Sequence, residues 1–483
     1  MRCAIGLLLM SMLLWSARAD EENPWVAKLP AAVAEARREG TAAAYLKALD
    51  AAWRADRWES GLELAEAANA KFPDEQRLRS SICRALWRAG RIIEAERIAE
   101  RLSSLGDDRV ALHMLILIHA SRGEFDKARK AGEQLRGLDD LTAADLSYVM
   151  TAWTDQPSHK DLLDVVRRIE KTIDPSKGYP ETLLGEMTEG LSEFLERAGS
   201  AEMNHIDQYG SAAMPQMPII SLPGCQVMIN GKGPYRMIVD TGGSIMLSLD
   251  TAVAEEGGLQ RMAGRTVRGV SGKEDAWQTL VDELRIGDVT CTRVMTAVFG
   301  VRAATAFTAD GIIGTGIFSD GRMTLDFEHA ALRLSPSSDR AAAGKEFPLR
   351  IISDAKLMAP VKIQGRPATA LLDSGAAVVA LSPTRLKRIF PDQTIRTFSL
   401  QVAGVGTGQK PEISFSRSVD LQFGGRKHEN ISGLGLDVLD TILSSHLGIQ
   451  SDVLIGMPTF RQMKSFTVDF PTRRMWIDWL EPE

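Results

Sequence analysis

Two stretches of this 483-residue sequence decide the fold: Met237-Ile238-Val239-Asp240-Thr241-Gly242 and Ala370-Leu371-Leu372-Asp373-Ser374-Gly375. In each stretch a short apolar run ends on an aspartate, which is followed by a hydroxyl residue and a glycine. Such a run predicts a buried β-strand that ends in a tight turn. One copy alone would favour only an aspartate that caps a turn, whereas two copies can bring two carboxylates to one site.

The sequence around the two motifs repeats in the same order. Each motif follows a hairpin pattern, Val227-Met228-Ile229-Asn230-Gly231 in the first copy and Val361-Lys362-Ile363-Gln364-Gly365 in the second. Further matched segments follow each motif: Arg268-Gly269-Val270-Ser271-Gly272 with Ala403-Gly404-Val405-Gly406-Thr407-Gly408, Leu284-Arg285-Ile286-Gly287 with Leu421-Gln422-Phe423-Gly424, Gly311-Ile312-Ile313-Gly314 with Val453-Leu454-Ile455-Gly456, and Thr324-Leu325-Asp326-Phe327 with Thr467-Val468-Asp469-Phe470. This order predicts two similar all-β lobes, each of which supplies one aspartate.

These motifs resemble the retropepsin and pepsin superfamily of aspartic proteases. The resemblance implies an all-β bilobal acid-protease fold, with a first retropepsin-like lobe over residues 217–338 and a second over residues 345–483. It also implies Asp240 and Asp373 as the catalytic pair, with a peptide or protein as substrate and no cofactor. In the family, the hydroxyls of Thr241 and Ser374 would join the two catalytic loops by hydrogen bonds. Gly242 and Gly375 allow the two backbones to approach where a Cβ would obstruct them.

Two facing carboxylates cannot both ionise cheaply, because like charges about 3 Å apart repel strongly in a site shielded from water. They therefore share one proton, so that one acts as general base on a water while the other donates to the substrate carbonyl. Pepsin-like enzymes carry Ser or Thr directly after the motif, whereas this chain has Gly243 and Ala376. Without those hydroxyl donors, we expect maximal activity at mildly acidic to neutral pH.

Two glycine-rich segments predict flaps, hairpins that close over an extended peptide and hydrogen-bond it as an added strand. The first-lobe candidates are Gly269, Val270, Ser271 and Gly272, and the second-lobe candidates are Gly404, Val405 and Gly406. A flap in each lobe resembles a retropepsin dimer fused into one chain.

The chain opens with Arg2, an apolar run over residues 4–15 and Ala17-Arg18-Ala19. This pattern predicts a cleavable signal peptide over residues 1–19, and therefore a secreted or periplasmic protein. The alternative is an uncleaved membrane anchor, but the run is short for a bilayer span. We therefore expect no stable membrane span after cleavage.

Residues 25–200 are rich in Ala, Arg, Glu and Leu at helical spacing, and they contain a second repeat. The segments that begin at Ala55, Ala89 and Arg122 align at offsets of 34 and 33 residues. This period resembles the tetratricopeptide repeat, an all-α array that binds protein partners through a concave face. The alternatives are a helical spacer or a pro-segment that packs on the protease. Residues 201–216 are predicted to form a linker.

The remaining composition excludes several classes of function. The net charge is −6 and basic residues are scattered, which argues against a nucleic-acid partner. The sequence contains no His-Glu-x-x-His and no Cys-x-x-Cys motif, so it predicts no metal site. Cys225 and Cys291 could form a disulfide in an oxidising compartment, or both could be buried thiols.

Two functions remain. The first is an aspartic endopeptidase, a hydrolase whose helical repeats recruit substrate or partner. The second is a catalytically silent peptide-binding or scaffold protein on a protease fold, since fold alone does not guarantee chemistry. Both aspartates, both hydroxyls and both glycines are present, which favours the enzyme.

Overall fold

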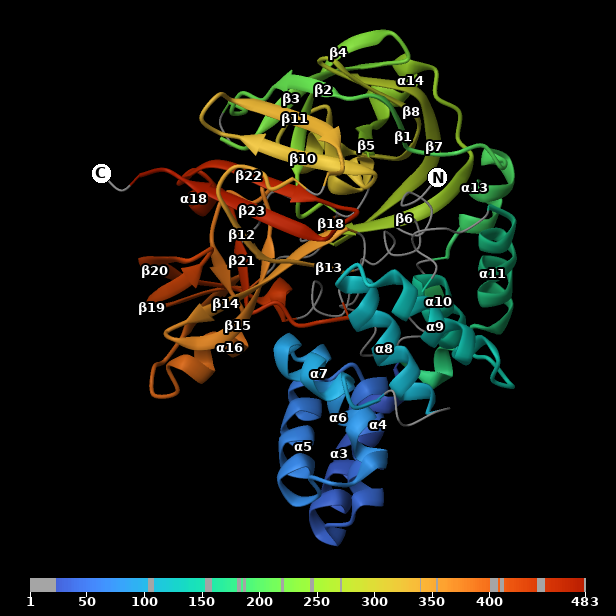
Figure 1. Ribbon diagram of the computed structural model, residues 1–483, viewed down its shortest axis with the longest axis vertical. Coiled ribbons are helices and arrows are strands. Elements are labelled where there is room, and N and C mark those ends of the chain that lie inside the picture. The colour runs from blue at the N-terminus through green and yellow to red at the C-terminus, as the bar shows by residue number, and fades with distance from the viewer. Residues whose placement is uncertain are drawn as a thin grey trace.

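The computed structural model describes residues 23–102, 108–152, 159–179, 184–185, 188–218, 221–243, 247–269, 272–338, 340–352, 355–399, 407–408, 412–440 and 448–481. The predicted signal peptide lies outside these residues. Helices form the N-terminal part and strands dominate the rest (Figure 1), which confirms the predicted fold class. In the part of the chain that the structure describes, no helix is long and apolar enough to cross a membrane.

The N-terminal region is a succession of helical hairpins, and polar side chains cap the N-termini of several of its helices. The side chains of Asn23 and Thr41 accept hydrogen bonds from the first-turn amides of the first two helices, at 3.0 and 3.2 Å. The helices are α3 (Pro24–Glu39), α4 (Ala42–Arg54), α5 (Trp58–Lys71), α6 (Gln76–Arg88), α7 (Ile92–Ala99), α8 (Arg109–Ser121), α9 (Phe125–Arg136), α10 (Ala143–Ala152), α11 (His159–Thr172), the 3-10 turn η2 (Pro175–Lys177) and α13 (Leu191–Ala198).

Three of these helix pairs, α4–α5, α6–α7 and α8–α9, are joined by turns of the same geometry. Asp56, Gly90 and Gly123 occupy the same place in the sequence repeat, and their φ angles are 52°, 73° and 75°. In each turn the next amide donates to the carbonyl five residues earlier: Arg57 to Ala52 at 2.9 Å, Arg91 to Leu86 at 2.8 Å, and Glu124 to His119 at 2.9 Å. The repeat in sequence is therefore a repeat in backbone conformation. Its assignment to the tetratricopeptide type stays a prediction.

The first lobe is built around a nine-stranded sheet with strand order β1-β8-β5-β9-β4-β3-β7-β18, in which β6 pairs with β7. Short helices α14 (Thr251–Gly257), α15 (Val301–Ala304) and η3 (Thr315–Phe318) connect its strands. The strands are β1 (His205–Gln208), β3 (Gly224–Ile229), β4 (Lys232–Asp240), β5 (Leu247–Asp250), β6 (Ala263–Gly269), β7 (Gly272–Ile286), β8 (Val289–Phe299), β9 (Gly311–Gly314) and, from the second lobe, β18 (Thr407–Gly408).

The second lobe has an eight-stranded sheet of corresponding design, with strand order β13-β14-β15-β21-β16-β20-β19-β17. Helices α16 (Pro383–Ile389), η4 (Asp437–Leu439) and α18 (Met457–Phe460) complete it. The strands are β13 (Arg350–Ile352), β14 (Lys356–Ile363), β15 (Arg366–Leu372), β16 (Ala380–Leu381), β17 (Arg396–Ser399), β19 (Glu412–Phe423), β20 (Arg426–Leu436) and β21 (Val453–Ile455).

A third sheet joins the lobes, with strand order β12-β23-β22-β10-β11-β2. At its centre the closing strands of the two repeats pair antiparallel, so that Thr324 faces Thr467, and their hydroxyls are 2.9 Å apart. Figure 1 shows β10 and β22 side by side, and their matched pairing places a pseudo-twofold axis between the lobes. The strands are β2 (Gly210–Ala213), β10 (Gly321–Asp326), β11 (Ala331–Pro336), β12 (Lys345–Pro348), β22 (Met463–Asp469) and β23 (Arg474–Trp479).

The prediction of a linker over residues 201–216 is wrong. Strand β1 in this segment pairs with β8, and β2 pairs with β11 of the sheet between the lobes. Ile206, Ala212 and Met214 are buried, so the segment belongs to the core. Its two strands have four residues each, too short to show a period-2 pattern in the sequence.

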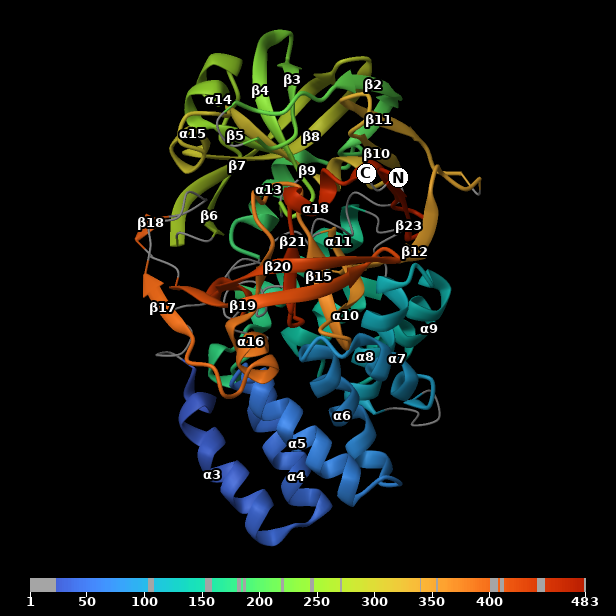
Figure 2. The same ribbon diagram turned by 90° about the vertical axis from the view of Figure 1, so that its left-hand side faces the viewer.

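The helical region packs directly on the second lobe (Figure 2). Gln450 donates its amide hydrogen to the Arg88 carbonyl at 2.7 Å. Arg350 of β13 forms a bidentate ion pair with Glu96 of α7, with N–O distances of 2.6 and 3.1 Å. One buried apolar cluster runs from the helices into the lobe, where it includes Ile352, Met358, Leu371, Ile449 and Leu454.

The last helix of the region reaches the first lobe. Helix α13 packs against β6 and β7, and Glu189 accepts a 3.0 Å hydrogen bond from the amide of Thr266 in β6. The helical region therefore contacts both lobes and is continuous with their cores.

Candidate active site

The two predicted aspartates occupy equivalent places in the two lobes. Asp240 is the last residue of β4, which runs parallel to β9. Asp373 follows β15, which runs parallel to β21, and its amide donates to the Ile455 carbonyl at 2.9 Å. The matched segments that begin at Gly311 and Val453 are therefore the strands that support the two loops with the aspartates.

Thr241 and Ser374 join the two loops by four reciprocal hydrogen bonds. Each hydroxyl donates to a carbonyl of the opposite lobe, Thr241 to Leu372 at 2.9 Å and Ser374 to Val239 at 2.7 Å. Each hydroxyl oxygen also accepts from the other residue's amide, at 3.0 Å for the Thr241 amide and 2.9 Å for the Ser374 amide. Both residues are fully buried. The loops are thus held in fixed register, which fixes the carboxylates they carry.

Gly242 and Gly375 each stand against the opposite aspartate. A Cβ on Gly242 would lie 2.2 Å from Cγ of Asp373, and a Cβ on Gly375 would lie 2.4 Å from Cγ of Asp240. Real Cβ atoms do not approach so closely, so any other residue would push the carboxylates apart. The amide of Gly242 also donates to Oδ1 of Asp240 at 2.8 Å.

The pKa of Asp373 is raised well above the usual value for a carboxyl group. Burial is the main cause, followed by the negative charge of Asp240 and a hydrogen bond between the two carboxyl groups. The positive charge of Lys356 and the amide of Gly375 act in the opposite direction. This environment favours the protonated form of the Asp373 carboxyl group.

Lys356 is the residue that sequence reasoning missed. It is the first residue of β14, its side chain is only 1% exposed, and its Nζ donates to the carbonyl oxygen of Gly242. One signal was available: when Val361 is matched to Val227, Lys356 falls opposite Leu222. The repeat thus contains a cation in one copy where the other has an apolar residue.

The first flap candidate is a hairpin, in which Gly269 of β6 pairs with Gly272 of β7. Val270 and Ser271 lie outside the described residues. In the second lobe β17 and β19 form the corresponding hairpin, and Gly404, Val405 and Gly406 also lie outside the described residues. Strand β18, just beyond them, pairs antiparallel with the end of β7. The described residues next to the two candidate segments, Gly272 and Lys273 in the first lobe and Thr407 and Gly408 in the second, therefore lie side by side.

The closing aspartates of the two repeats have structural contacts. Asp326 accepts from Arg333 at 3.0 Å, and Asp469 accepts from Arg322 at 3.1 Å. Cys225 and Cys291 are buried free thiols, so the disulfide is not formed. Burial raises the pKa of both thiols to about 12, which makes them unreactive.

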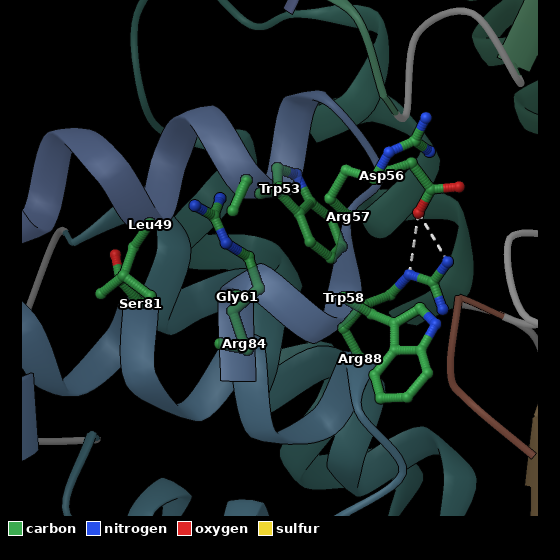
Figure 3. Close-up of a pocket in the computed structure, with 11 residues that line it drawn as sticks. Leu49, Trp53, Asp56, Arg57, Trp58, Gly61, Ser81, Arg84 and Arg88 are labelled. Atoms are coloured by element: carbon green, nitrogen blue, oxygen red, sulfur yellow. Dashed lines mark hydrogen bonds and ion pairs between the residues drawn. The ribbon is translucent and has the colours of Figure 1, made fainter. Parts of the chain in front are cut away.

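A small pocket lies apart from these residues, among α4, α5 and α6 of the helical region (Figure 3). Its lining includes Trp53, Trp58 and Arg84, and an ion pair between Asp56 and Arg88 closes one side (Figure 3). The volume is about 10 Å³, which is enough for one water molecule. This pocket is therefore too small to hold a peptide.

Part of each β lobe is similar to a known protein family. Residues 225–317 and 359–459 match the family model described as aspartyl protease, which covers less than half of the chain but one segment in each lobe. The chain is similar to a retropepsin-like aspartic protease from Rickettsia conorii, with 17% identity over 23% of this chain and 86% of that chain, and a TM-score of 0.18. No curated protein matches the chain. Each β lobe thus contains one segment that is similar to the aspartyl protease family, and an N-terminal helical region precedes the lobes.

Proposed function

We propose that the protein is an aspartic endopeptidase in which Asp240 and Asp373 activate a water molecule for peptide-bond hydrolysis. The observation that carries this proposal is the reciprocal bonding of Thr241 and Ser374, which holds the two carboxyl groups face to face. Such rigid positioning of an acid and a base is what general acid–base catalysis requires.

The environment of Asp373 supports different roles for the two carboxyl groups. Asp373 carries the proton, because burial and the neighbouring charge raise its pKa. Asp240 is then the base: it takes a proton from the water as the water oxygen attacks the peptide carbonyl carbon. Asp373 gives its proton to the carbonyl oxygen, which produces a neutral tetrahedral diol without a covalent enzyme intermediate.

Collapse of the diol returns both carboxyls to their starting state. Asp240 gives its proton to the leaving nitrogen as the C–N bond breaks, and Asp373 takes the proton from one diol hydroxyl as the carboxyl product forms. Glycine at positions 242 and 375 permits the short distance between the carboxyls that this exchange needs.

The helical region has two proposed roles. A groove of about 280 Å³ on α5, α6 and α7 supports recruitment of a substrate or partner protein, and its lining includes Glu66, Arg79, Glu94 and Arg97. The apolar cluster shared with the second lobe supports a second role, in which the helices stabilise the protease.

We also propose that residues 1–19 act as a cleavable signal peptide and direct the protein to the periplasm or outside the cell.

The test is an assay of the purified protein, without residues 1–19, against a diverse peptide library over acid to neutral pH. Asp240→Asn and Asp373→Asn serve as matched controls, because each keeps the side-chain shape and removes one ionisable group. We expect cleavage by the wild type alone. If no peptide is cleaved by the wild type and left intact by both variants, the alternative of a silent peptide-binding protein is favoured.

A further inference from the structure

Lys356 is a buried cation in contact with the catalytic loop of the other lobe. It belongs to β14 of the second lobe, yet its ammonium group donates to the carbonyl of Gly242 in the first. Only 1% of the residue is exposed. A lysine is rarely buried to this extent, because its ammonium group loses hydration, unless nearby acceptors and negative charge compensate.

Both lobes fix the position from which Lys356 reaches this loop. The preceding residue, Ala355, has a φ of 59°, and its carbonyl accepts a 3.1 Å hydrogen bond from the hydroxyl of Thr315 in the first lobe. Within the second lobe, β14 pairs with β13 on one side and β15 on the other. The backbone of Lys356 is therefore held by contacts with both lobes.

The cation is present on one side of the pseudo-twofold axis only. The corresponding position in the first lobe is the buried Leu222, which has no charge. The remaining parts of the site are arranged symmetrically: two aspartates, two hydroxyl residues and two glycines. Lys356 therefore gives a symmetric pair of carboxyls an asymmetric electric field.

The charged groups that act on Asp373 come from two elements. Asp240, at the end of β4, disfavours ionisation of Asp373, whereas Lys356 of β14 favours it. In a buried site such charges are weakly screened by solvent and salt. The effect of Lys356 on the pair should therefore persist at high ionic strength.

We propose that Lys356 is a positioning residue of the catalytic pair: it holds the Gly242 carbonyl and sets the pH range in which the two aspartates carry a single negative charge. This inference rests on the proposed aspartic protease function. A nearby cation stabilises both the singly and the doubly ionised pair, so it moves both limbs of the pH–rate profile toward acid. Loss of the cation moves both limbs toward neutral pH.

The test compares kcat/KM against pH for the wild type and three variants of Lys356. Lys356→Gln keeps a hydrogen-bond donor and removes the charge, Lys356→Met removes both, and Lys356→Arg keeps the charge. For Gln and Met we expect both limbs to move to higher pH by about one unit, the lower end of the range for the effect of an opposite charge on a carboxyl pKa. The Arg variant should retain the wild-type limbs. Lys362→Met, which removes an exposed lysine from the same strand, is the matched control and should change nothing.

A purely structural role for Lys356 predicts a different result. Activity would then fall at every pH, with both limbs of the Gln and Met profiles at the wild-type positions, and this result would overturn the proposal. If the Met variant does not fold, the Gln variant decides alone, since it keeps the polar contact with the Gly242 carbonyl.

A second measurement does not depend on activity. Because the pKa of Asp373 is raised, the free energy of unfolding falls as pH rises from the usual carboxyl pKa to that of folded Asp373. In Lys356→Gln this fall should extend to higher pH, and adding Asp373→Asn should abolish the difference. If the wild type cleaves no peptide but this extension is seen, the proposed function fails while the interaction of Lys356 with Asp373 stands. If the wild type cleaves peptides but Lys356→Gln changes neither the pH dependence of stability nor the limbs of the pH–rate profile, only the proposed role of Lys356 is wrong.

Discussion

Thr241 and Ser374 exchange two hydrogen bonds with each other and two with the carbonyls that precede the opposite aspartate, and all four lie in the buried interface between the lobes. Each residue is both donor and acceptor, so neither hydroxyl can be lost without leaving buried polar groups unpaired. The two lobes are therefore joined most tightly where the carboxyl groups need fixed geometry.

Ser374→Ala should destabilise the protein and lower kcat. The change leaves the Val239 carbonyl and the Thr241 amide without their partner, and two unpaired buried groups cost about 2–4 kcal/mol. Chemical denaturation measures the loss of stability. Thr241→Ser is the control, because it keeps the hydroxyl oxygen and removes only a methyl group. Equal losses in the two variants would contradict a hydrogen-bonding role.

Asp373→Asn should stabilise the fold at neutral pH while it abolishes cleavage. The folded pKa of Asp373 is raised, so ionisation of this buried group costs stability as pH rises, and asparagine has no such ionisation. The melting temperature of the variant should exceed that of the wild type by a few degrees at neutral pH, since each kcal/mol corresponds to about 2–4 °C. This difference should disappear in acid.

Asp326→Asn is the contrasting control for that experiment. Burial alone would raise the pKa of Asp326, but hydrogen bonds from His329 and Arg333 outweigh it and lower the pKa. This variant should therefore lose stability at neutral pH. Stabilisation by both substitutions would show that charge at position 373 is not the cause.

Gly243→Ser should move the acid limb of the pH–rate profile to lower pH. A Cβ at Gly243 would lie 3.1 Å from Oδ2 of Asp240, so a serine hydroxyl could donate to that carboxylate and favour its ionised form. Gly243→Ala adds the same Cβ without the hydroxyl and is the matched control. The same shift in both variants would show that the added carbon, not the hydroxyl, is responsible.

Gly90→Ala should weaken the contact between the helices and the second lobe. Gly90 has a φ of 73°, and an added Cβ would lie 2.4 Å from the Gln450 carbonyl oxygen. The expected loss is about 2 kcal/mol or more, because a clash adds to the left-handed strain. Gly365 has the same φ and no atom within 4 Å of an added Cβ, so Gly365→Ala measures the strain alone. Equal losses would mean that this contact adds no stability.

The sequence predicts the strands that carry the aspartates because each is a compact apolar run with a distinct ending. It also predicts the helical turns, where Gly90 and Gly123 fall at the repeat period and adopt positive φ. Lys356 was missed because a lysine at a strand end resembles a surface residue, and its burial depends on contact with the other lobe. The pairing of β18 with β7 was likewise missed, because a strand of two residues leaves no pattern in the sequence.

The most direct test of the central claim is peptide cleavage by the wild type beside Asp240→Asn and Asp373→Asn, with all three proteins shown to be folded. We predict cleavage by the wild type, with maximal activity at mildly acidic to neutral pH, and none by either variant. Cleavage by a variant at the wild-type rate would contradict a water activated jointly by Asp240 and Asp373.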